Sequence, residues 1–137
     1  MITKIRDNLF LGGIKDLVER DLKELGITCI LNVASEINDK IKGFILEKEG
    51  FGDNWQDAKR FAPAAADLLI DLLQEGKVVF VHCAVGKSRS PHVIALALAK
   101  MLDKNYYEVF NEIRELRPQV LAVSLQEDID NNVRNRF

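Results

Sequence analysis

The chain has 137 residues, of which 47% are hydrophobic and 29% are charged, and its formal net charge is -2. We expect residues 1–137 to form one domain with a single core, because this length suffices for one and the composition is that of a globular protein, not of a disordered or membrane-spanning one. A net charge so close to zero gives no reason to expect nucleic acid or an anionic membrane as the main partner, so any attraction for an anion must be local.

The first third of the chain predicts short strands around one helix. Three runs of apolar and branched residues predict strands at Ile2–Arg6, Leu9–Leu11 and Ile27–Ala34. Between the second and third strands, apolar residues at helical spacing predict a helix over Ile14–Leu25, and Gly26 is expected to end it. Gly43–Leu46 is a weaker strand candidate.

The segment Glu47–Asp57 is expected to be a loop, because it has two glycines and little periodicity. A helix with one apolar face follows, and this face is formed by Phe61, Ala65, Leu68, Leu69, Leu72 and Leu73. Pro63 implies that this helix begins near Arg60 or bends there, since proline cannot donate the backbone hydrogen bond that a helix interior requires.

The centre of the chain is the stretch VVFVHCAVGKSRSP, residues 78–91. Its wholly apolar start predicts a buried strand over Val78–His82, of the kind found in parallel sheets. A loop over Cys83–Ser88 is expected next, and then a helix from about Arg89 to Asp103. Pro91 lies in the first turn of that helix, where its missing N–H costs nothing.

Two capping-box patterns predict further helices in the last third. Asn105 followed by Glu108 is expected to open a helix that runs to about Arg117, and Ser124 followed by Glu127 opens a last helix that ends near Arg136. Strands separated by helices, with helices at the end, are typical of an α/β domain. We therefore predict a mostly parallel central sheet flanked by helices.

Cys83 directly follows the carboxyl end of the buried strand, in the loop that leads to the helix. Ligands in such sheets bind beyond the carboxyl ends of the strands. The helix N-terminus, a loop able to turn several N–H groups inward, and the guanidinium of Arg89 all favour a thiolate over a thiol at Cys83. The same groups favour a bound phosphate and the charge on its oxygens during transfer. The pattern predicts an oxyanion site with a nucleophile beneath it.

The residues around Cys83 have distinct expected roles. His82 is expected to help fix the orientation and charge of the nucleophile, and Ser90 to donate a hydrogen bond to the sulfur when it leaves. The residues expected to surround the phosphate are Ala84, Val85, Gly86, Lys87, Ser88 and Arg89. The alternative, a buried core thiol near a surface arginine, would make the fixed offsets of these residues a coincidence.

The run His82-Cys83-x-x-Gly86-x-x-Arg89-Ser90 resembles the H-C-x-x-G-x-x-R-[ST] signature of the cysteine-dependent protein tyrosine phosphatases, and AVGKSRSP resembles its dual-specificity branch. The segments IRDNLFLGG and LGITCILNVASE are similar to N-terminal stretches of that branch. The resemblance implies hydrolysis of phosphotyrosine, with phosphoserine and phosphothreonine as further candidates, through a cysteinyl-phosphate intermediate. Members usually carry a Pro-Asn pair that braces the loop, where this chain has Leu121-Ala122.

The resemblance also implies an aspartate that acts as general acid from a loop upstream of the cysteine. Asp53 and Asp57 are the candidates in the segment 47–57. Family spacing favours Asp53, whereas Asp57 has a rival role as the N-cap of the next helix, which is the commoner use of such an aspartate. We expect Asp53 to be the acid, and Asp57 stays open as the alternative.

Two other functions stay open: a phosphatase for a non-protein phosphomonoester (a phosphoinositide, a glycan or an RNA 5′ end), and a non-catalytic module that binds phosphoproteins. The second is disfavoured because Cys83, Arg89 and an acid are all present, whereas such relatives usually lack the nucleophile. No metal and no cofactor is expected, since no ligand spacing indicates a metal and the implied reaction needs none.

The expected partner is a phosphorylated protein substrate, with no nucleic acid or membrane partner, and the expected state is a monomer. The two cysteines, Cys29 and Cys83, form no Cys-x-x-Cys pair and indicate neither a zinc site nor a disulfide framework. A reducing cytoplasm is the expected location, because it keeps a nucleophilic thiol usable. Cys29 lies in a predicted strand and is expected to be a core thiol.

Overall fold

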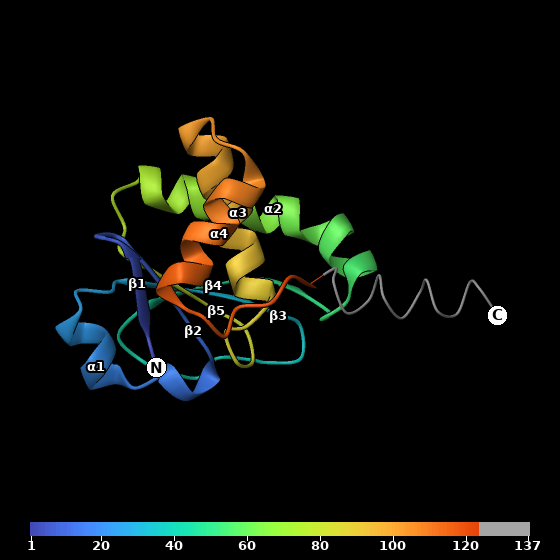
Figure 1. Cartoon of the computed structure of the whole chain (residues 1–137). Helices are drawn as coiled ribbons and strands as arrows, with labels where there is room; N and C mark the ends of the chain where they lie inside the picture. Colours follow the sequence, from blue (N-terminus) through green and yellow to red (C-terminus); the bar gives the residue numbers. More distant parts are fainter. Residues whose placement is uncertain (124–137) are drawn as a thin grey trace.

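The computed structural model of the chain describes residues 1–123. Its strands form one sheet of five, in the order β1-β2-β5-β3-β4 (Figure 1). The strands are β1 Thr3–Arg6, β2 Leu9–Gly12, β3 Cys29–Ala34, β4 Ile45–Phe51 and β5 Val79–His82. Only the pair of β1 and β2 is antiparallel, while β5 pairs in parallel with β2 and β3, and β3 with β4. The prediction of a mostly parallel sheet is confirmed.

Helices cover both faces of this sheet (Figure 1). They are the 3₁₀ turn η1 Ile14–Asp16 and the helices α1 Glu19–Glu24, α2 Trp55–Gln74, α3 Arg89–Leu102 and α4 Tyr106–Leu116. The three long helices, α2 to α4, lie on one face, and α1 lies on the other. No helix within residues 1–123 is long and apolar enough to cross a membrane.

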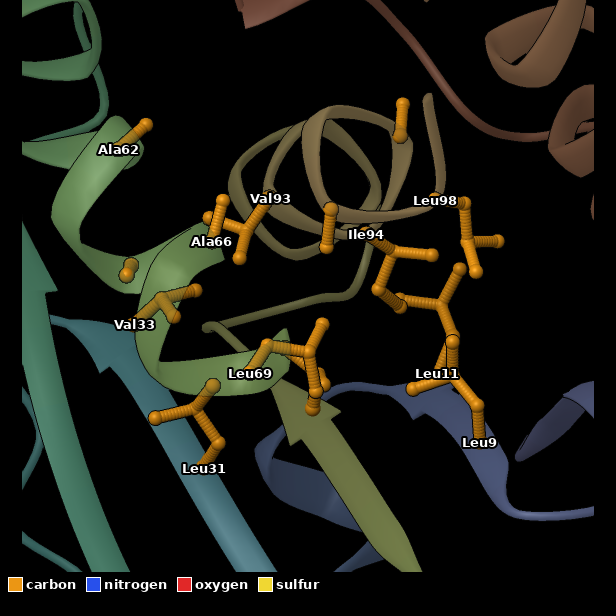
Figure 2. Close-up of a cluster of buried hydrophobic side chains, with 14 of the residues drawn as sticks. Leu9, Leu11, Leu31, Val33, Ala62, Ala66, Leu69, Val93, Ile94 and Leu98 are labelled. Atoms are coloured by element: carbon orange, nitrogen blue, oxygen red, sulfur yellow. The ribbon is translucent and has the colours of Figure 1, made fainter. Parts of the chain in front are cut away.

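Alternation along the central strands divides the core into two layers. Leu9 and Leu11 of β2 and Leu31 and Val33 of β3 face α2 and α3, where they meet residues such as Leu69 (Figure 2). On the opposite face a smaller cluster contains Phe10, Leu22, Ile27, Ile30 and Phe80. Because side chains alternate along a strand and both faces are covered, these strands are apolar throughout.

The helix predicted over Ile14–Leu25 is wrong in its extent. The segment forms the turn η1 and then only α1, because Val18 between them is extended, with φ -115° and ψ 115°. The helical spacing of apolar residues misled the prediction. Leu22 is fully buried, whereas Ile14, Val18 and Leu25 are each more than 40% exposed and form no core-facing stripe.

The loop predicted over Glu47–Asp57 is wrong in its extent, because β4 runs from Ile45 to Phe51 and α2 begins at Trp55, so only residues 52–54 connect them. The strand expected at Gly43–Leu46 overlaps β4 at Ile45 and Leu46. As the edge strand, β4 is mostly exposed and shows no apolar alternation. Gly50, which suggested a loop, instead permits β4 to lie close to the turn after β3: a Cβ there would lie 2.8 Å from the Cα of Ser35.

Helix α2 begins at Trp55, not near Arg60, and Pro63 lies inside it. Its N-cap is Asn54, whose side chain accepts a hydrogen bond from the Asp57 N–H, so the alternative role of Asp57 as N-cap is wrong. Phe61 was predicted on the apolar face, but it is 42% exposed. Propensity alone could not locate this start, because burial of the apolar face of α2 in the core offsets the cost of Pro63, and this packing is a tertiary effect.

The elements after β5 agree with the sequence. Helix α3 spans Arg89–Leu102 with Pro91 in its first turn, and α4 begins after Asn105, whose side chain accepts from the N–H of Tyr107. The helix predicted from the Ser124 and Glu127 pattern lies outside the described residues.

Candidate active site

Strand β5 delivers Cys83 to the carboxyl edge of the sheet, as predicted. Its side chain is only 2% exposed, and its Sγ lies 3.1 Å from the hydroxyl oxygen of Ser90 in the first turn of α3. The thiol therefore lies at the bottom of the loop 83–88, directly before a helix N-terminus. A hydroxyl within hydrogen-bond distance can stabilise negative charge on this sulfur.

The backbone carbonyls of this loop all accept hydrogen bonds from outside it. Two side chains donate to three of these carbonyls: His82 Nδ1 to that of Cys83 (3.0 Å), and the Arg117 guanidinium to those of Val85 (3.3 Å) and Gly86 (2.8 Å). Backbone N–H groups donate to the other three: Ile14 to Ala84 (2.9 Å), Leu121 to Lys87 (2.7 Å) and His92 to Ser88 (3.1 Å). In a planar trans peptide the C=O and the following N–H point in opposite directions. The N–H groups of residues 84–89 therefore face away from these donors.

Those N–H groups form an anion cradle. Among the residues that the structure describes, no carbonyl or side chain accepts a hydrogen bond from the N–H groups of residues 84–88. Successive unpaired N–H groups in such a loop, followed by a helix N-terminus, make a concavity that suits a phosphate. The structure thus brings the predicted cradle residues together in one loop, and their binding of phosphate stays a prediction.

Glycines let the loop pack closely against β2. Gly86 has a φ of +71°, which favours glycine, and a Cβ there would lie 2.6 Å from the carbonyl carbon of Gly12. A Cβ on Gly13 would likewise lie 2.8 Å from the carbonyl carbon of Val85. The pair Gly12-Gly13 therefore makes room for the loop.

Arg89 is buried and held by Glu36, a residue that the sequence analysis did not identify. Nη1 and Nη2 donate to the two Glu36 oxygens at 2.7 and 2.6 Å, and Nη1 also donates to Phe51 O at 2.8 Å. Burial alone would lower the pKa of Arg89, but its hydrogen bond with Glu36 and the nearby acidic groups raise it. The hydrogen bond from Arg89 lowers the pKa of Glu36 from 4.5 to about 2.

The hydrogen bonds to Glu36 and Phe51 use three of the five N–H groups of Arg89, so Nε–H and the second N–H of Nη2 are left for a ligand. The Nε of Arg89 is buried and has no partner within residues 1–123. An unpaired buried donor costs free energy, so it indicates a site where an acceptor belongs. Glu36 thus fixes the guanidinium while leaving Nε for an oxyanion.

Asp53 precedes α2 and Asp57 lies in the first turn of that helix, and the two carboxylates have different partners. Asp53 is exposed and its Oδ1 accepts a hydrogen bond from the Ser88 hydroxyl at 2.9 Å. It lines a cavity of about 250 Å³ with Lys87 and Leu121 beside the loop. Asp57 Oδ2 instead accepts from the N–H of Gly52 at 2.9 Å. Asp53 therefore faces the loop, and Asp57 braces the turn.

Arg117 braces the loop where the usual Pro-Asn pair is missing. It is 3% exposed, and besides its bonds to two loop carbonyls it donates to Thr3 Oγ1 at 2.9 Å. Burial lowers its pKa, an effect that the charges of Asp16 and Cys83 partly offset. No sequence signal identified Arg117, whereas Glu36 was detectable in principle, since it follows β3, the strand beside β5, at the carboxyl edge.

His92, behind the loop on α3, carries a prediction about stability. It is 8% exposed, and its Nδ1 lies 2.7 Å from the Tyr106 hydroxyl oxygen. Burial lowers its pKa from 6.5 to about 4. A group whose pKa is lower in the folded state stabilises the fold above its unfolded pKa, so this stability is lost as the pH falls from about 6.5 to 4, by roughly 2–3 kcal/mol.

Urea unfolding at pH 7.5, 6.0 and 4.5 tests this expectation. In His92→Gln, whose amide oxygen can still accept from Tyr106, the free energy of unfolding should change less over this range than in the wild type. If the free energy of unfolding changed equally with pH in both proteins, the pH-dependent stability could not be assigned to His92. Glu36 does not confound the test, because the pKa shift of Glu36 affects stability only at lower pH, between about 4.5 and 2.

Comparison with known proteins agrees with this geometry. Residues 9–128 match the family model described as "Dual specificity phosphatase, catalytic domain". Human dual specificity protein phosphatase 9 is 29% identical over 122 residues, and human dual specificity protein phosphatase 12 is 30% identical over 131 residues; each alignment covers 85% of this chain. The chain spans about a third of the length of these curated relatives (32% and 36%).

Solved structures share the fold. The human tyrosine phosphatase-like serine/threonine/tyrosine-interacting protein superposes with a TM-score of 0.77 at 23% identity, over 96% of both chains. Human DUSP28 superposes with a TM-score of 0.78 at 19% identity, over 88% of this chain and 84% of that chain. At these identities the similarity establishes the architecture alone.

Proposed function

Because the chain belongs to the dual-specificity phosphatase family, we propose that it is a cysteine-dependent phosphatase of phosphorylated proteins. Phosphotyrosine is the proposed substrate, with phosphoserine and phosphothreonine as further ones. We also propose that residues 1–137 act as one catalytic domain. The family assignment rests on the match over residues 9–128.

The observation that carries the proposal is the cradle above Cys83. Within the described part of the chain, the N–H groups of residues 84–88 and the buried Nε of Arg89 have no partner, and they belong to the loop and helix start that directly follow Cys83. This donor set matches a phosphoryl group with three equatorial oxygens, and a thiolate beneath it is placed for in-line attack.

The proposed reaction has two steps. In the first, the Cys83 thiolate forms a bond to phosphorus while the bond to the leaving oxygen breaks, and the Asp53 carboxyl group gives that oxygen its proton. In the second, water attacks the cysteinyl phosphate, Asp53 as carboxylate takes a proton from the water, and the P–S bond breaks. The hydroxyl of Ser90, 3.1 Å from Sγ, is proposed to donate to the departing thiolate.

The cavity beside the loop supports a protein substrate. Its lining is largely apolar, with Val85, Leu121, Ala122 and Val123, and Lys87 is its one cation within residues 1–123. A polyphosphorylated ligand such as a phosphoinositide would require more cations. The surface therefore favours an amino-acid side chain that carries one phosphate.

We further propose a monomer in the cytoplasm, without nucleic acid or membrane partners. The near-zero net charge supports the absence of polyanionic partners. A nucleophilic thiol persists in a reducing compartment. Burial raises the pKa of the second thiol, Cys29, from 9.0 to about 11, which supports a core role for Cys29.

Hydrolysis of p-nitrophenyl phosphate in the presence of EDTA tests this function. We expect turnover without metal and inhibition by vanadate, which mimics the phosphoryl group in the cradle. Rates on phosphotyrosine peptide, phosphoserine peptide and inositol phosphates would then rank the substrates. A lack of hydrolysis by folded protein would contradict the function, and faster turnover of inositol phosphates would contradict the substrate class.

A further inference from the structure

His82 and Asp39 form a buried pair behind Cys83. The side chains of His82 and Asp39 are 0% and 5% exposed, and the His82 Nε2 lies 2.8 Å from the Asp39 Oδ2. The other ring nitrogen, Nδ1, lies 3.0 Å from the carbonyl oxygen of Cys83. Phe80 stacks on the imidazole at a centroid distance of 5.8 Å. The ring thus connects a carboxylate to the backbone of the nucleophile.

Both atoms that the imidazole faces are hydrogen-bond acceptors. A neutral imidazole has one N–H and one lone pair, so it can satisfy only one of them, whereas an imidazolium donates to both. A proton shared by a carboxylate and an imidazole favours the imidazole, which is the stronger base. We propose that Asp39 is a positioning residue that keeps a hydrogen on both ring nitrogens of His82 and so holds the peptide group after Cys83 in place.

The charged groups around the pair are consistent with this assignment. Glu19 of α1, Lys40 beside Asp39, and Glu47 and Lys48 of β4 line the two hollows on either side of Asp39. Lys48 is engaged by Ser35 O and by Asn38 Oδ1. Within residues 1–123, His82 is the sole cationic partner of Asp39, whose second oxygen, Oδ1, is buried and unpaired.

The protonated ring of His82 affects the Cys83 thiol through one peptide group, the one between Cys83 and Ala84. The imidazolium donates from Nδ1 to the Cys83 carbonyl, which turns the N–H of Ala84 toward the cradle because the peptide is planar. A charged donor binds and polarises that carbonyl more strongly than a neutral one. Asp39 thereby favours the thiolate of Cys83. The inference rests on the proposed function only in treating Cys83 as the nucleophile.

Two measurements on the full chain test it, with Asp39→Asn as the variant. An Asn side chain can donate to Nε2, so it keeps the geometry while allowing a neutral ring. The ¹⁵N resonances of the His82 ring report the protonation of each nitrogen. The rate of iodoacetamide alkylation at Cys83, assigned by mass spectrometry across pH 5–9, reports the thiolate. Glu47→Gln is the matched control, because it removes the same charge from a neighbour of Asp39 in the same hollow.

In the wild type we expect both ring nitrogens to be protonated at neutral pH. In Asp39→Asn one ring nitrogen of His82 should lose its hydrogen, and the alkylation profile of Cys83 should move to higher pH. A displacement of about one pH unit would lower the alkylation rate at pH 6 on the order of tenfold. Glu47→Gln should leave the profile unchanged.

A neutral His82 ring in the wild type would overturn the proposal, even if Asp39→Asn failed to fold. An unchanged profile in folded Asp39→Asn, or an equal shift in Glu47→Gln, would also overturn it. Neither the ring resonances nor the alkylation rate depends on turnover. If the wild type did not hydrolyse p-nitrophenyl phosphate, the proposed function would be contradicted, but these two measurements would still test the role of Asp39.

Discussion

Replacing Cys83 by serine is expected to abolish turnover of p-nitrophenyl phosphate, with a loss in kcat on the order of 10⁴-fold or more. The serine hydroxyl is a far weaker nucleophile than a thiolate. Within residues 1–123 the one side-chain partner of Sγ is the hydroxyl of Ser90, which is too weak a base to activate a serine. The phosphate donors do not depend on the sulfur. Binding of phosphotyrosine peptide should therefore persist in Cys83→Ser.

The experiment combines steady-state kinetics with a binding measurement on the same preparations. The matched control is Cys29→Ala, which removes the other thiol from the core, away from the cradle. This control should keep kcat close to the wild-type value while losing some stability, since it removes a buried sulfur. Substantial turnover by Cys83→Ser, or a comparable loss in Cys29→Ala, would contradict the assignment of the nucleophile.

The second large effect distinguishes Asp53, between β4 and α2, from Asp57 in the first turn of α2. Asp53→Asn should lower kcat by about 10²–10⁴-fold, because a placed acid no longer protonates the leaving oxygen. Asp57→Asn should keep most activity and instead lose about 1 kcal/mol of stability, since its carboxylate accepts from the N–H of Gly52 rather than facing the loop.

Leaving-group dependence makes this test specific for proton donation. In a series of aryl phosphates, the difference in kcat between Asp53→Asn and the wild type should become smaller as the phenol becomes more acidic, because good leaving groups depart without a proton. A loss that is the same for every substrate would indicate a positioning role, and a collapse of kcat in Asp57→Asn would show that Asp57 is the acid.

The placement of Cys83 and Arg89 was predictable because it depends on local geometry. A buried strand, a short loop and a helix bring residues six positions apart to one point, and Gly86 permits the tight turn between them. Asp53, the expected acid, accepts a hydrogen bond from Ser88 in the loop, and its role as the acid stays a prediction. In contrast, the edge strand β4 was mistaken for a loop, because an exposed strand lacks the apolar alternation on which such predictions rest.

The sequence by itself determined where Cys83, Arg89 and the loop between them lie, and it indicated the family, because these features follow from residue types at short, fixed separations. Only the tertiary structure decided what supports them. Glu36 meets Arg89 from 53 positions away, Asp39 meets His82 from 43, and Arg117 meets Gly86 from 31. No periodicity or motif records such pairs, because they form only when packing of the sheet and helices brings distant segments together and buried polar groups must find partners.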